Sequence, residues 1–193
     1  MQNKRIILAS TSPRRKELLA KTGLLFEVLP GSYEEDMSLP MSPTELAKYL
    51  SKGKAEAVAT ENPEAVVIGA DTFLSFEGQV LGKPHTKERA KEMLNMLNGK
   101  QHSVITGVTV IEKASDKIIS ETFESKVTFK NLTDEEIDRY IATGEPLNRA
   151  GAYAIQGGGD KFIEKIEGDY DLIVGLPVLE VVKILKDFDI HVE

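Results

Sequence analysis

Two long runs of alternating apolar and polar residues constrain the fold of this chain more than any other feature. They are "HSVITGVTVIE" at 102–112 and "ETFESKVTF" at 121–129, and a short segment around Ser115, Asp116 and Lys117 joins them. Such alternation is typical of β-strands, and a connection this short makes the two strands antiparallel neighbours. A sheet built only from parallel strands is therefore excluded.

Apolar periodicity and capping signals predict further strands and helices on both sides of this pair. Expected strands cover 5–9, 24–29, 65–70 and 161–168, with a hairpin over 73–81, and expected helices cover 13–22, 43–59, 86–99, 133–141 and 176–188. The two kinds of element do not alternate strictly. We therefore expect a mixed α/β fold with a twisted central sheet and flanking helices, formed by residues 1–193 as a single domain with two lobes.

Composition excludes several classes of function. The net charge of −7 argues against binding to nucleic acid or to an anionic membrane, because both require a basic surface. The chain has no cysteine, so disulfides, zinc–thiolate sites and thiol nucleophiles are excluded. No apolar run approaches the ~20 residues of a membrane-spanning helix. The N-terminal sequence also lacks the apolar core of a signal peptide, so we expect a cytoplasmic protein.

Three consecutive cations, Arg14, Arg15 and Lys16, follow the predicted start of a helix. Ser12 suits the N-cap and Pro13 the first helical position. A helix N-terminus already carries about half a positive charge, so its first turn normally favours Asp or Glu. One interpretation is that the two arginines bind an external anion such as phosphate, together with the backbone N–H groups. The alternative is that these cations simply point into solvent.

Two further charged residues, Asp71 and Lys54, stand out by their position. Asp71 directly follows the apolar run at 65–70, at the predicted carboxyl end of a buried strand, where ligands bind in α/β sheets. It is a candidate metal ligand or general base, although an Asp there can also cap a helix or bind the next turn. Lys54 falls on the apolar face of its helix, near Leu46 and Leu50. Its ammonium must therefore either meet an anion or extend to solvent.

Three other motifs do not indicate a function when each is taken alone. Lys83 stands in "GKP", the acidic run "YEED" covers 33–36, and "AGAYAIQGGG" at 150–159 holds Tyr153 and Gln156. Each has a plain alternative: a common loop tripeptide, a solvated acidic loop and an ordinary glycine-rich turn. Together with the cations, they fit a polyphosphate bound with a hard metal ion. Neither the G-x-S-x-G motif of serine hydrolases nor a Walker A motif occurs.

Seven segments, in order along the chain, carry a resemblance to a known family. They are "LASTSPRRKELL", "KGKAEAVA", "VIGADT", "LGKP", "GKQHSVITGV", "NLTDEEIDRYIATGEPLNRAGAYAIQG" and "GDYDLIVGLP". These segments resemble the motifs of the Maf family of nucleoside triphosphate pyrophosphatases, over about residues 5–188. The resemblance implies a fold related to the inosine triphosphate pyrophosphatases, with two lobes around a cleft. It also implies hydrolysis of a nucleoside triphosphate to the monophosphate and pyrophosphate, with Mg²⁺, Mn²⁺ or Co²⁺ as cofactor.

The resemblance further implies roles for particular residues. Substrate-binding residues fall on Ser10, Ser12, Arg14, Arg15, Thr72 and Gln156, and catalytic residues on Asp71, Glu35, Lys54 and Lys83. Asp71 would accept a proton, Glu35 and Asp71 would bind the metal, and Glu34 is the alternative register for Glu35.

Three motifs indicate the branch of the family. "SPRR", "ADT" and "GAYxIQG" are similar to the dTTP/UTP pyrophosphatases, in which Thr72 and Gln156 would select the base. The chain departs from common family sequence at Asn148, Arg149, Gly158 and Leu172.

The residues and the resemblance together predict a metal-dependent hydrolase of nucleoside triphosphates that prefers dTTP and UTP. The alternative is a non-catalytic, nucleotide-binding regulator of septum formation and cell division. Asp71 and the lysines speak against that alternative, because a protein that only binds nucleotides needs no general base. The expected partner is the nucleotide substrate, and we expect binding neither to nucleic acid nor to a membrane. The sequence is compatible with a homodimer.

Overall fold

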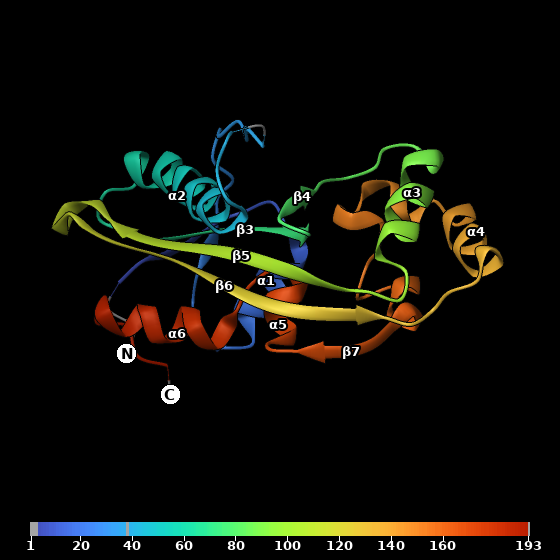
Figure 1. The fold of residues 1–193 in the computed structure, drawn as a ribbon. Coiled ribbons are helices and arrows are strands. Elements are labelled where there is room, and N and C mark those ends of the chain that lie inside the picture. Colours follow the sequence, from blue (N-terminus) through green and yellow to red (C-terminus); the bar gives the residue numbers. More distant parts are fainter. Residues whose placement is uncertain (1–3, 38, 193) are drawn as a thin grey trace. The chain divides into compact units, whose positions relative to one another are not determined.

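The computed structural model describes residues 4–37 and 39–192 and contains a mixed set of strands and helices (Figure 1). The strands are β1 Ile6–Ala9, β2 Glu27–Val28, β3 Val66–Phe76, β4 Gln79–Leu81, β5 Gln101–Glu112, β6 Lys117–Phe129 and β7 Ile163–Glu167. The helices are α1 Pro13–Ala20, α2 Pro43–Glu61, α3 Lys87–Leu97, α4 Asp134–Ala142, α5 Tyr170–Val174 and α6 Val178–Asp187. The expected mixed α/β class is confirmed.

The strands are ordered β2-β1-β3-β5-β6-β7, and β4 pairs with β3. β1 runs parallel to β2 and β3, whereas β4 is antiparallel to β3 and β7 is antiparallel to β6. One 3₁₀ turn, Lys113–Ser115, joins β5 to β6, and Figure 1 shows these two long strands running in opposite directions. The antiparallel pair predicted from its alternating sequence is therefore confirmed.

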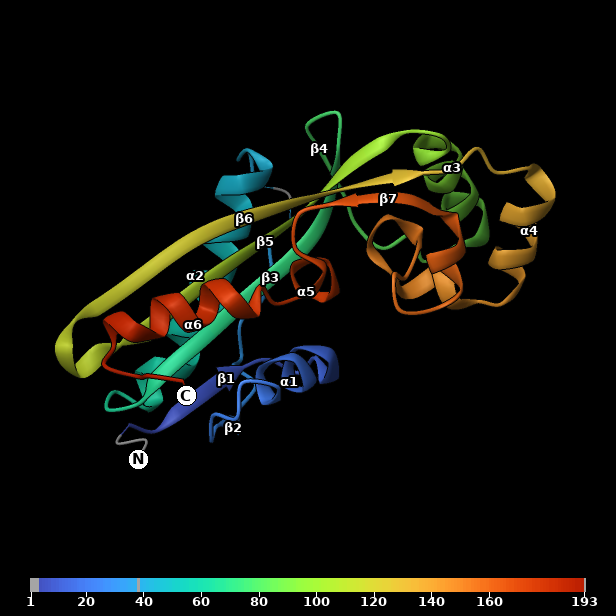
Figure 2. The ribbon, with the colours of Figure 1, turned by 90° about the horizontal axis from the view of Figure 1, so that it is seen from below.

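The chain divides into two compact units, and β3, β5 and β6 contribute residues to both. The first unit holds the described residues of 1–72, 106–123 and 171–193, and the second holds 73–105 and 124–170. In the first unit, α2 and α6 cover opposite faces of the strands (Figure 1, Figure 2). Its core includes Ile7 and Val67 from the sheet and Ala55 and Val58 from α2, all of them buried.

The backbone of helix α2 packs directly on the sheet of the first unit, because two strand glycines leave room for it. A Cβ on Gly69 of β3 would lie 2.5 Å from the carbonyl oxygen of Ser51, and one on Gly107 of β5 would lie 2.0 Å from that of Ala47. The hydroxyl of Ser51 also hydrogen-bonds that of Thr109 at 2.8 Å inside the core. These contacts set both the distance between α2 and the sheet and the position of the helix along β3 and β5.

The second unit is organised around an aromatic cluster. The ring of Phe129 meets those of His102 and Tyr153 edge to face, with centroids 5.0 and 4.8 Å away. The Tyr153 hydroxyl and His102 Nε2 are hydrogen-bonded at 2.8 Å, and the Tyr140 hydroxyl accepts from the backbone N–H of Ala154 at 3.1 Å. These contacts hold the glycine-rich segment of short 3₁₀ turns that follows α4.

The buried His102 predicts how stability depends on pH. Burial lowers the pKa of His102 from 6.5 to about 4, and its Nδ1 atom has no hydrogen-bond partner among the described residues. The unfolded chain takes up this proton below about pH 6.5, whereas the folded chain does so only near pH 4. The free energy of unfolding should therefore fall as the pH drops through that window, by roughly 2 kcal/mol between pH 7 and pH 5.

Urea denaturation of the wild type and of His102→Phe at both pH values checks this prediction. The substitution also removes the partner of the buried Tyr153 hydroxyl, so the comparison concerns the change with pH rather than absolute stability. A variant as sensitive to pH as the wild type would contradict the assignment to His102.

The structure corrects four details of the sequence interpretation. Only Glu27–Val28 of the expected strand 24–29 is extended, and α5 was not predicted. The expected strand 65–70 and the first arm of the hairpin form one continuous strand, β3. Asp71 was expected at the carboxyl end of a strand but lies inside β3. The partner strand β1 ends opposite Gly69, so Asp71 lies just past the parallel pairing.

Candidate active site

Lys54 of α2 forms ion pairs with two carboxylates of the first unit. Its Nζ atom lies 2.8 Å from Glu35 Oε1 and also hydrogen-bonds Asp71 Oδ1. The exposed fractions are 17% for the Lys54 side chain, 8% for Asp71 and 46% for Glu35. Lys54 therefore lies on the inner face of its helix, as its sequence position predicts, and its ammonium meets anions of the chain itself.

The start of α1 carries the arginines. Ser12 is the N-cap, and its side-chain oxygen accepts from the backbone N–H of Arg15 at 3.5 Å. The first turn of α1 contains no acidic residue, so no side chain of that turn balances the positive end of the helix dipole. Ser10 supports this turn, because its hydroxyl accepts from the backbone N–H of Ser12 at 3.1 Å. Arg14 and Arg15 are both half-buried.

A hydrogen-bond network fixes the guanidinium of Arg15. Its Nε donates to the carbonyl of Gly175 at 2.8 Å, and its Nη2 donates to the hydroxyl of Thr72 at 3.2 Å. The Thr72 hydroxyl lies 2.9 Å from that of Thr106, which donates to the carbonyl of Leu172 at 3.1 Å. Thr72 thus contacts Arg15 directly and connects it to the interior of the sheet.

The charges of these side chains influence one another. Burial lowers the pKa of Arg15, and the nearby Arg14 adds to this effect, whereas the carboxylates of Asp71 and Glu35 raise it. Arginine remains a cation in proteins even so. The first unit therefore gathers cations and carboxylates at one place, which suits a polyanion accompanied by a metal ion.

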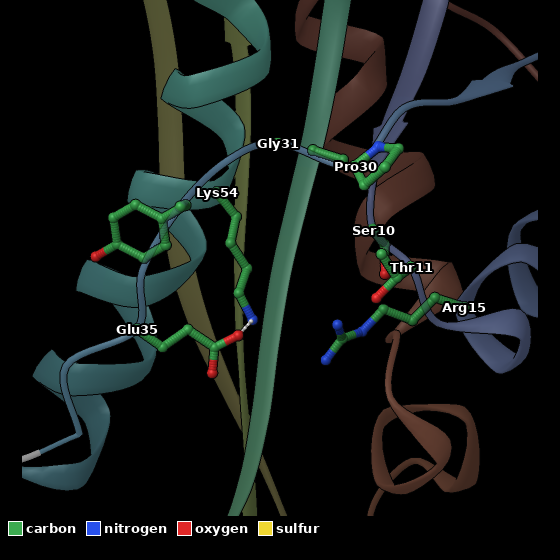
Figure 3. Close-up of a pocket in the computed structure, with 9 residues that line it drawn as sticks. Ser10, Thr11, Arg15, Pro30, Gly31, Glu35 and Lys54 are labelled. Carbon is green, nitrogen blue, oxygen red and sulfur yellow. Dashed lines mark ion pairs between the residues drawn. The ribbon is translucent and has the colours of Figure 1, made fainter.

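A pocket of about 180 Å³ lies between these groups. It is lined by Ala9, Ser10, Thr11, Arg15, Pro30, Gly31, Tyr33, Glu35 and Lys54. Figure 3 shows the guanidinium of Arg15 and the Lys54–Glu35 ion pair approaching this space from opposite sides. Pockets for whole small-molecule ligands usually measure about 300–1,000 Å³, so this one suits phosphate groups rather than an entire nucleotide.

Glu35 and Asp71 are chemically suited to hold a divalent cation. Mg²⁺ usually takes one or two carboxylates and completes its coordination with phosphate oxygens and water. Both carboxylates meet the same ammonium, that of Lys54, so their oxygens converge. Within residues 4–37 and 39–192, no group of three or more His, Asp or Glu side chains could hold a metal ion. A metal here would therefore depend on the substrate for part of its coordination.

Eight of the predicted site residues lie in one unit of the structure. Ser10, Ser12, Arg14, Arg15, Glu35, Lys54, Asp71 and Thr72 belong to the first unit. Lys83 and Gln156 belong to the second unit, where both are exposed. Sequence reasoning missed Thr106, Gly175 and Tyr33. A threonine on the buried face of a predicted strand was the available signal for Thr106, whereas Gly175 contributes only its backbone carbonyl.

Comparison with known proteins identifies the fold first. The Staphylococcus aureus Ham1 protein superposes with a TM-score of 0.50 and 13% identity, and the match covers 97% of this chain and 100% of that one. At this identity the likeness concerns the fold alone. The described part of this chain contains no helix of the length and apolarity needed to cross a membrane.

Sequence comparison then identifies the family. The model of the Maf-like protein family matches residues 5–188, and the chain belongs to this family. A dTTP/UTP pyrophosphatase of Bacillus anthracis (strain CDC 684 / NRRL 3495) is 48% identical over 189 residues, covering 98% of both chains. One of Bacillus cereus (strain ATCC 10987 / NRS 248) is 49% identical over 189 residues, covering 98% of this chain and 92% of its own.

Proposed function

We propose that this protein hydrolyses nucleoside triphosphates, with a preference for dTTP and UTP, to the nucleoside monophosphate and pyrophosphate. The observation that carries the proposal is the pocket in which Arg15 faces Lys54, whose ammonium is paired with the carboxylates of Glu35 and Asp71. The relatives named dTTP/UTP pyrophosphatases support it, because they match nearly the full length of the chain. We place this activity in the cytoplasm and assign it to residues 1–193 acting as one domain.

The reaction is attack of water on the α-phosphorus. Asp71 accepts a proton from the water, the bond to the bridging oxygen breaks, and pyrophosphate leaves with the electron pair. Arg14 and Arg15 bind phosphate oxygens, and Lys54 orients Asp71 through its Oδ1 atom. A bound Mg²⁺, Mn²⁺ or Co²⁺ ion would neutralise phosphate charge, with Glu35 and Asp71 as its protein ligands.

Further roles fall on the remaining candidate residues. Lys83 supplies another cation for the phosphates, and Ser10 and Ser12 hold the turn that presents the arginines. Thr72 acts on the substrate through Arg15, whose guanidinium it contacts. Gln156 reads the base, because its amide offers a donor and an acceptor to the edge of thymine or uracil.

The substrate preference gives the first test. We expect kcat/KM with Mg²⁺ to be at least about tenfold higher for dTTP and UTP than for ATP and GTP, since an unmatched recognition amide costs about 1–3 kcal/mol. Gln156→Glu should narrow this difference, whereas Gln79→Glu, at an exposed glutamine of β4, should not. The measurement is release of monophosphate and pyrophosphate from each triphosphate.

Three outcomes would contradict the proposal. A preference for purine nucleotides, or unchanged selectivity in Gln156→Glu, would remove the glutamine from base recognition. If no triphosphate were hydrolysed with Mg²⁺, Mn²⁺ or Co²⁺ but nucleotides still bound, the protein would instead be a non-catalytic regulator of septum formation.

A further inference from the structure

The segment that carries Glu35 has little structure of its own. Residues 29–36 follow β2 and form neither helix nor strand. Along the described residues 30–37, Tyr33 alone is half-buried, and all the others are exposed. Tyr33 is therefore the most buried side chain among these residues, and Glu35 lies two residues beyond it.

The ring of Tyr33 lies directly on Gly53 of α2. A Cβ placed on Gly53 would lie 2.2 Å from both Cε2 and Cζ of the ring and 2.7 Å from the phenol oxygen. Real Cβ atoms essentially never approach another atom closer than 3.0 Å, so only glycine leaves room for the ring. Burial raises the pKa of the Tyr33 phenol. The phenol of Tyr49, one helical turn before Gly53, raises this pKa further.

The glycine has no evident role in the helix itself. It lies in the interior of a 19-residue α-helix, where glycine is less favourable than alanine. Its backbone does not have the positive φ that would require glycine. Lys54, the ion-pair partner of Glu35, is the next residue, and Tyr33, Glu35 and Lys54 all line the same pocket.

We infer that Tyr33, seated on Gly53, is a positioning residue that sets the register of the loop on α2 and so brings Glu35 to Lys54 and Asp71. The contact acts on the reaction through Glu35. This inference rests on the proposed function, because Glu35 matters there as a catalytic and metal-binding carboxylate.

Gly53→Ala is the direct test, because it fills the space under the ring while raising the helix propensity of α2. We expect kcat for dTTP to fall by about 100-fold, since small displacements of a catalytic group have effects of this size. KM should change far less, and the melting temperature should not fall. Cleavage after Glu34 and Glu35 by a glutamate-specific protease, followed by peptide mass, should become severalfold faster as the loop is released.

Three further variants separate positioning from general effects. Thr60→Ala raises helix propensity at an exposed position of the same helix and should leave kcat and cleavage unchanged. Tyr33→Ala removes the ring and should release the loop. In Tyr33→Ala, the additional change Gly53→Ala should have no further effect on kcat, because the ring it displaces is already gone.

The inference is overturned if Gly53→Ala keeps the wild-type kcat and cleavage rate. It is also overturned if kcat and melting temperature fall together, since the glycine would then serve the helix as a whole. An inactive wild-type protein would contradict the proposed function instead, and the cleavage rates would still decide whether Tyr33 positions the loop.

Discussion

Asp71→Asn should lower kcat for dTTP by about 1,000-fold and leave the protein folded. Asparagine keeps the volume of the side chain but removes the proton acceptor and one anionic ligand for the metal, and general-base catalysis contributes about 100- to 10,000-fold in enzymes. The position is 6% exposed, and the side chain hydrogen-bonds Lys54. Lys54 keeps Glu35 as a partner in the variant, so no buried charge is left alone.

The measurement is kcat at saturating dTTP, together with the melting temperature. Asp138→Asn is the matched control, because it removes the same charge from an exposed pair with Lys91 in the second unit. That variant should keep wild-type turnover. A folded Asp71→Asn protein with near wild-type kcat would refute the assignment of Asp71 as the proton acceptor.

Features that depend on neighbouring residues were predictable from the sequence. The capping boxes of Ser42 with Glu45 and of Thr133 with Glu136 begin α2 and α4 where the sequence places them. Helical spacing also predicted that Lys54 faces inward. These predictions succeed because helix starts and helix faces are determined within one or two turns of the chain.

Features that depend on distant residues were not predictable. Arg15 is held by Gly175, 160 positions away, and Thr72 contacts the same carbonyl across 103 positions. Sequence reasoning placed Asp71 at a strand end, because nothing in the local sequence reveals that β3 continues after β1 has ended. Likewise, the role of Gly53, the single glycine of α2, becomes evident only when the loop that packs on it is known.

Lys54→Met should abolish most of the activity and also destabilise the fold. Methionine keeps much of the length of the side chain but leaves Glu35 and Asp71 facing each other without the cation that now binds both. Removing one partner of a fully buried ion pair costs about 3–5 kcal/mol, and the half-exposed Glu35 reduces this to about 2 kcal/mol here. We expect kcat for dTTP to fall by about 1,000-fold, because the cation that orients Asp71 is lost.

The double variant Lys54→Met with Asp71→Asn separates the two effects. Removing the second charge relieves the repulsion, so the free energy of unfolding in urea should recover towards the wild-type value while activity stays absent. Lys52→Met is the matched control, since this nearby lysine of α2 is exposed and pairs with Glu56 at the surface, at 3.6 Å. It should change neither quantity by much. If the double variant were no more stable than Lys54→Met alone, Lys54 would not be separating two mutually repelling carboxylates, and its role in orienting Asp71 would have to be abandoned.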